Sequence, residues 1–297
     1  MNTMTKTIIA VALAASLGLA ACGDSEGDNN GANNGGDTAT LTLQSDGVPA
    51  LGDGYVWEGW LVTSDGPQTT GRFNLEDGKS EYTFDVSSEL ASNATKFVLT
   101  IEPAEGDDPA PAATKFLAAD LNDGAGTATI DTAPAIGTDF SSAAGSYILA
   151  APTGDNASYT NGLWFLDNSG QDPVASLTLP DLPEGWAYEG WVVKDGPVST
   201  GNFIAPDMAD SDMGGPYAGP NDAPPFPGQD FVTEGNERDL TDGHMVVISV
   251  EPDPDDSPMP FTLKPLVDDT VEDVGMGSAQ DLSNTAGEFP TMGVTVE

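Results

Sequence analysis

The sequence predicts an all-β protein made of two tandem β-sandwich modules of the immunoglobulin-like type. Its apolar residues come in short runs rich in Val, Leu, Ile, Thr and aromatic side chains, separated by Gly, Pro, Asp and Asn. Many short strands between turn signals are typical of sandwiches. A second observation is an internal repeat of motifs. A third is the weakness of helical patterning, since residues 86–97 favour one helical turn at most.

The first 21 residues are expected to be a signal peptide. Lys6 precedes an apolar run that is too short to span a membrane. Residues 19–22, Leu-Ala-Ala-Cys, resemble the bacterial lipobox. The resemblance implies that Cys22 is lipidated, carrying acyl chains such as palmitate that anchor the protein stably. Gly23 then favours the outer membrane, on its periplasmic face or the cell surface; a plain signal peptide with an unused thiol is the alternative.

Residues 22–38 are predicted to hold the lipidated cysteine and a disordered Gly/Asn/Asp tether, because they carry almost nothing apolar to bury. The whole chain has 48 acidic and 8 basic side chains, a net charge of −40. Nucleic acids and anionic lipid surfaces are therefore not expected partners, since both need clustered Lys and Arg. The single cysteine leaves no disulfide within the chain.

Beyond the tether, apolar alternation and turn signals mark the expected strands. They cover residues 39–43, 55–62, 71–75, 82–86, 97–102, 114–119, 127–131, 146–151, 162–166, 175–179, 188–193, 245–251 and 261–267. The pair 146–151 and 162–166 has two interpretations. It either extends the sheet of the second module or closes the edge of the first.

The modules are predicted at residues 39–135 and 145–297 because these segments repeat one set of motifs. WEGW at 57–60 returns as YEGW at 188–191, and FVLTIEP at 97–103 returns as VVISVEP at 246–252. The return of these motifs in the same order shows that one module is duplicated. The repeated signature consists of Trp60, Trp191, Glu102, Glu251, Lys115 and Lys264. We expect each lysine to form a cross-strand ion pair with the glutamate of its own copy.

Alternation along residues 188–193 places Glu189 and Trp191 on one face of a strand and Tyr188 and Gly190 on the other. Both faces carry apolar groups, which favours a central strand. Gly190 is expected to leave room for an aromatic ring from across the sandwich.

The order of these motifs resembles the C-terminal extracytoplasmic domain of anti-sigma-K factors. The resemblance covers residues 41–120 and 177–269, and in the second copy it rests on 188–193, Asp-Gly-Pro at 195–197, the Gly-x-Phe element, 246–252 and Ser-Pro-Met-Pro at 257–260. It implies an exported, sensor-like β module. Such factors bind sigma through a helical cytoplasmic domain that this sequence does not show, so sigma-factor binding is not expected.

The second copy carries an insertion, since Phe203 and Val246 are 43 positions apart whereas Phe73 and Phe97 are 24 apart. The long acidic and Pro-rich loop at residues 205–243 is therefore expected to be functional or disordered. Its carboxylates have spacings that a calcium loop uses, and a solvated acidic loop is the alternative. The candidate ligands are Asp207, Asp210, Asp212, Asp222 and Asp230.

Three aromatic residues of the same loop, Tyr217, Phe226 and Phe231, are candidate partner contacts. The alternative is that these rings cap the open end of the sandwich. His244 is the only histidine, and no nucleophile motif accompanies it. We therefore expect a strand-edge histidine and no enzymatic activity.

Together these observations predict a membrane-anchored envelope lipoprotein that binds, senses or interacts with an extracytoplasmic protein or small ligand. It requires no cofactor, with calcium as an optional ligand. The alternatives are a calcium-stabilised adhesive or structural module and a hydrolase of envelope polymers. The hydrolase would need two or more buried carboxylates with shifted pKa values in a cleft.

Overall fold

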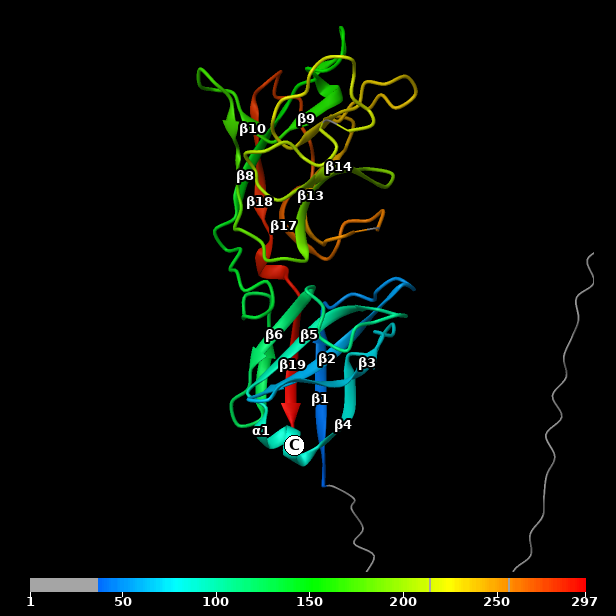
Figure 1. Cartoon of the computed structure of the whole chain (residues 1–297). Helices are drawn as coiled ribbons and strands as arrows, with labels where there is room; N and C mark the ends of the chain where they lie inside the picture. The colour runs from blue at the N-terminus through cyan, green and yellow to red at the C-terminus, as the bar shows by residue number, and fades with distance from the viewer. Residues whose placement is uncertain (1–36, 214, 256) are drawn as a thin grey trace, which may run out of the picture. The chain divides into compact units, whose positions relative to one another are not determined.

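The computed structural model describes residues 37–297, apart from 214 and 256, and shows an all-β sandwich fold (Figure 1). These residues belong to one compact unit. The predicted signal peptide, Cys22 and nearly all of the tether lie outside the described residues. Among the described residues, none of the helices is long and apolar enough to cross a membrane.

The first sandwich consists of two four-stranded antiparallel sheets, ordered β4-β1-β19-β7 and β3-β2-β5-β6. Their strands are β1 (Thr38–Asp46), β2 (Tyr55–Thr63), β3 (Gly66–Phe73), β4 (Glu81–Ser87), β5 (Lys96–Pro103), β6 (Lys115–Asp120), β7 (Ala125–Ala128) and β19 (Thr291–Val296). The one helical turn expected between residues 86 and 97 is α1 (Ser88–Asn93). The Ser87 side chain caps it by accepting a hydrogen bond from the Leu90 amide at 3.1 Å.

The second sandwich is built on a nine-stranded sheet ordered β14-β13-β16-β17-β18-β8-β9-β15, in which β12 also pairs with β8. The strands are β8 (Ala144–Leu149), β9 (Gly162–Trp164), β12 (Leu177–Thr178), β13 (Trp186–Val193), β14 (Pro197–Phe203), β15 (Gly228–Asp230), β16 (Met245–Pro252), β17 (Leu263–Asp268) and β18 (Ala279–Asn284). The smaller elements are β10 (Leu166–Asp167), β11 (Val174–Ala175), η1 (Tyr159–Asn161) and η2 (Ala286–Glu288). The strands at 146–151 and 162–166 thus extend the second sheet.

The two copies exchange their last strands. β19, at the end of the second copy, lies antiparallel between β1 and β7 of the first, beside the blue β1 in Figure 1. β8, which follows the first copy, lies antiparallel between β12 and β18 of the second. β12 carries the Leu-Thr motif that matches β1. The pairing of β8 with β12 is therefore equivalent to the pairing of β19 with β1. This corrects the predicted module at 145–297, because its final strand completes the other sandwich.

The predicted face alternation is confirmed. Tyr188 and Val192 belong to the main hydrophobic cluster, whereas Glu189 and Trp191 lie on the opposite face of β13. A Cβ at Gly190 would come within 3.0 Å of the Phe165 ring, which explains the glycine. The same cluster continues through both copies, so a single core holds them.

Aromatic rings join the copies within that core. Phe116 of β6 lies 6.4 Å from Trp186 of β13 and 5.6 Å from Phe261, between ring centroids. Phe116 also packs 5.0 Å from Trp57 of β2. Aromatic pairs at these separations stabilise a core beyond the area that they bury.

Candidate ligand-binding site

A buried polar network lies on the outer face of the sheet that contains β2 and β5. Trp60 faces away from the main core, and its indole Nε1 donates to Thr100 Oγ1 at 2.9 Å. The Thr100 hydroxyl donates to Glu102, whose Oε1 also accepts from the Ala112 amide at 2.8 Å. The network therefore fixes a carboxylate at the end of β5.

The second copy repeats the network atom for atom. Trp191 Nε1 donates to Ser249 Oγ at 2.7 Å, and the Ser249 hydroxyl donates to Glu251. Glu251 Oε1 accepts from the Phe261 amide at 2.8 Å. The repeated WEGW/YEGW and Glu-Pro motifs thus supply the indole donor and the final acceptor of one arrangement in both copies.

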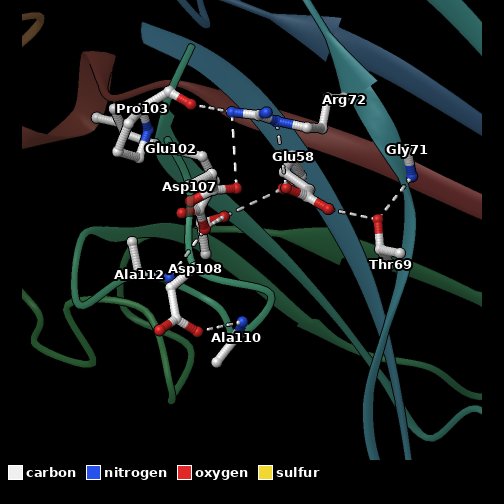
Figure 2. Close-up of polar contacts among 12 residues, drawn as sticks. Glu58, Thr69, Gly71, Arg72, Glu102, Pro103, Asp107, Asp108, Ala110 and Ala112 are labelled. Carbon is white, nitrogen blue, oxygen red and sulfur yellow. Dashed lines mark hydrogen bonds and ion pairs between the residues drawn. The ribbon is translucent and has the colours of Figure 1, made fainter. Parts of the chain in front are cut away.

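A second buried glutamate stands on β2, and in the first copy a cation compensates it. Glu58 accepts from the Thr69 hydroxyl, and Arg72 Nε lies 3.5 Å from Glu58 Oε2. Arg72 also lies 3.6 Å from Asp107 and donates to the Pro103 carbonyl (Figure 2). Arg72 therefore joins two carboxylates and the end of β5 on this face.

In the second copy the equivalent glutamate, Glu189, accepts from the Ser199 hydroxyl, but Asn202 stands in the place of Arg72. Burial, together with the neighbouring charge of Glu251, raises the pKa of Glu189 to about 7, against the hydrogen bond from Ser199. Burial likewise raises the pKa of Glu251 to about 7, against its hydrogen bonds from Ser249 and Phe261. The second copy thus holds two carboxyl groups that exchange protons near neutral pH.

Glu251 reaches a cavity of about 410 Å³ between the loop that precedes β2 and the loop that follows β16. The Glu251 side chain has no exposed surface, and no hydrogen-bond partner of its Oε2 is found among the described residues. The residues around it on the cavity wall are mainly apolar. They include Leu51, Tyr55, Ile101, Pro252, Pro254 and Phe261, and the polar residues Asp53, Asp255 and Ser257 also line the cavity.

The expected ion pairs of the repeat signature are not formed. Lys115 Nζ donates instead to the Ala112 carbonyl at 3.1 Å, and the ion pairs found in the described part of the chain involve Arg72, Lys79, Lys96 and Lys194. Lys264 acts on Glu251 only at longer range, lowering its pKa. The buried glutamates take neutral donors from the same strand and the following loop, which is why that prediction was wrong.

The five candidate calcium ligands do not converge. Asp230 is buried and accepts from Thr153 N at 2.7 Å and from Trp164 Nε1 at 2.7 Å, so it holds the sheet together. Asp210 and Asp212 both approach Gly201, each placing an atom 2.6 Å from a Cβ built there. Asp207 and Asp222 are exposed. Residues 37–213, 215–255 and 257–297 contain no group of three or more His, Cys, Asp or Glu side chains placed to hold a metal ion.

The aromatic residues of the insertion cap the second sandwich. Phe231 is fully buried and Tyr217 stacks on it at 5.7 Å, while Phe226 packs against a small cluster around Trp164. The expectation of exposed contact residues is therefore corrected, because the insertion folds back and pairs β15 with β9. It is neither a free acidic loop nor disordered in the described part.

His244 lies just before β16, as expected, and it is buried rather than at an open edge. The alternation in the sequence places Glu189 on the same face as Trp191. It does not indicate that Glu189 or Glu58 belongs to a site. The available signal was a glutamate between two aromatic residues at the same place in both copies. Such a residue is exposed in most proteins, so only the covering loops reveal its burial.

No protein-family model, curated protein or solved structure matches this chain.

Proposed function

We propose that this chain is a non-enzymatic, lipid-anchored envelope protein that binds a small organic cation, such as a primary ammonium compound, in the Glu251 cavity. The single observation that carries the proposal is the buried Glu251 oxygen without a partner among the described residues, at a cavity with mainly apolar walls. A buried carboxylate oxygen left without a donor costs about 1–3 kcal/mol or more. A ligand N–H group that reaches it recovers that free energy.

The walls of the cavity fit the carbon part of such a ligand. Tyr55 and Phe261 present aromatic rings, which attract ammonium groups by about 0.5–2 kcal/mol when the site is dry. Asp53 and Asp255 line the same cavity, and their negative charges attract a cation to it and repel an anion from it. Both features support a cation in preference to a neutral or anionic ligand.

The arrangement supports binding in preference to carboxylate-based hydrolysis. A hydrolase of that kind needs a pair of carboxyl groups, of which the proton donor has a raised pKa in a buried setting. Glu251, Asp53 and Asp255 all line the cavity, but Glu251 alone of the three is buried. The other buried glutamate, Glu189, is engaged with Ser199 outside the cavity. The repetition of the Trp–hydroxyl–Glu network in both copies supports its role in holding the strands in place.

The test is calorimetric titration of the soluble chain from Gly23 onward with n-butylammonium, and with n-butanol as a neutral analogue of the same shape. We expect the ammonium to bind and the alcohol not to bind. Glu251→Gln should weaken ammonium binding about 10- to 100-fold, because a hydrogen bond to a charged group is lost. Glu189→Gln is the matched control, since it removes an equally buried carboxyl outside the cavity, and it should bind as the wild type does.

The wild-type protein supplies a second readout that needs no variant. A cation binds the ionised carboxylate, so affinity should rise as the pH rises through about 7, the raised pKa of Glu251. Equal binding of butanol, retained affinity in folded Glu251→Gln, or affinity that does not change between pH 5.5 and 8.5 would each reject the proposal.

A further inference from the structure

A second cavity gathers the scarce basic groups of the chain. The whole sequence has eight Lys and Arg residues and one His. Lys194, Arg238 and His244 all line a cavity of about 420 Å³ beside the turn that joins β13 to β14. This cavity is separate from the Glu251 cavity, with which it shares no lining residue.

Two nitrogen atoms at this cavity lack partners. The side chain of His244 is only 6% exposed, and its Nδ1 has no hydrogen-bond partner among the described residues. The imidazole also interacts with the Leu240 backbone. Arg238 Nε is also buried without a partner there, while its guanidinium lies 5.6 Å from the centre of the Phe231 ring. The structure therefore holds a fixed cation and an imidazole ready for a ligand.

Carboxylates surround the cavity but lie at its exposed rim. Asp242 is 2.8 Å from Lys194 Nζ, which neutralises it. Asp239 accepts from the Thr241 amide at 3.1 Å, and Glu237 accepts from the Gly235 amide at 2.7 Å. Asp195 is exposed in the turn. These four carboxylates are exposed and therefore partly screened by water, and of them Asp239 and Asp242 still act on His244. The His244 ring and Arg238 Nε are buried.

We propose that this cavity is a proton-coupled site for a small oxyanion, a carboxylate or a phosphate, held by Arg238 and by a protonated His244. The guanidinium supplies charge and directed N–H donors, which suit the oxygens of both anions. A proton on Nδ1 turns the unpartnered acceptor of the neutral ring into a second donor. The bond that forms is a charge-assisted hydrogen bond from each side chain to the anion.

Proton uptake follows from the surroundings of the imidazole. Burial lowers the pKa of His244, and the charges of Lys194 and Arg238 lower it further, while Leu240 and Asp242 act in the opposite direction. The ring is therefore neutral at neutral pH in the absence of ligand. A bound anion offsets the two cations and raises the pKa, so binding takes up a proton and becomes tighter as the pH falls.

The single histidine makes the test direct, because its imidazole C–H signals in NMR spectra of the untagged chain from Gly23 onward report this cavity alone. The probes are sodium phosphate and sodium acetate, added at constant ionic strength with sodium chloride as the balancing salt. We expect one or both anions to shift the signals with saturation and to raise the His244 pKa. Affinity should increase by up to about tenfold for each pH unit lost.

Arg238→Gln should weaken binding at least tenfold while the histidine signal remains observable. Lys79→Gln, in the first copy, removes the same charge far from this cavity in sequence and should leave binding unchanged. If Arg238→Gln does not fold, the pH series on the wild type decides the question. No saturable shift with either anion at pH 5.5, or equal loss in Lys79→Gln, overturns the proposal; n-butylammonium should not move the signals, which keeps this test separate from the one above.

Discussion

The strand exchange predicts that a side chain at the end of the second copy stabilises the first sandwich. Met292 on β19 has no exposed surface, and it lies opposite Ala128 of β7 and Ser45 of β1. Met292→Ala removes a fully buried apolar side chain and should lower the free energy of unfolding by about 2–5 kcal/mol. That is a large part of the roughly 5–15 kcal/mol of a typical domain.

Urea unfolding would measure the loss, and amide hydrogen exchange would locate it. Exchange should accelerate first in β1 and β7. Met276→Ala is the matched control, because Met276 also belongs to the second copy but is 72% exposed, and it should change stability by less than about 0.5 kcal/mol. Faster exchange confined to the strands of the second copy, with β1 and β7 unaffected, would refute the assignment of β19 to the first sandwich.

Three further predictions concern charge, calcium and the lipid anchor. Folding raises the pKa of Glu189 and Glu251 from 4.5 to about 7, so the folded state holds extra protons between these values. Stability should therefore fall as pH rises through that window, by on the order of 3 kcal/mol per group at most, and denaturation of the Gln variants should show a flatter profile. Because the five candidate ligands do not converge, calcium should shift the melting temperature no more than magnesium at the same ionic strength; a larger rise with calcium that Asp210→Asn with Asp212→Asn abolishes would contradict this. Cys22→Ser should abolish palmitate labelling in a bacterial host and release the protein from membranes.

The repeat and the strands could be predicted from local patterns. Alternation along residues 188–193 gave the correct faces for Tyr188 and Glu189, because a strand places successive side chains on opposite sides whatever its partner is. The same alternation predicted that Gly190 leaves room for an aromatic ring from across the sandwich. Strands β14, β15, β18 and β19 were missed. In β19, Met292, Val294 and Val296 alternate with polar residues and glycine, but the apolar run is short.

The candidate site was predicted only in outline. Glu102 and Glu251 were identified as part of the repeat, but their burial and their hydroxyl partners depend on contacts that the three-dimensional fold creates. The exchange of Arg72 for Asn202 was visible in the aligned motifs. Its consequence for two buried carboxyl groups was not visible, since a pKa depends on the three-dimensional surroundings.

The sequence by itself determined the duplication, the all-β class and the inner and outer faces of the central strands, because these follow from residue order and the two-residue period of a strand. Only the tertiary structure decided which sheet each terminal strand joins, that Lys115 does not pair with Glu102, and that scarce basic groups meet around His244. Strand partners and buried charges are chosen by contacts between residues far apart in the chain, and no local pattern specifies them.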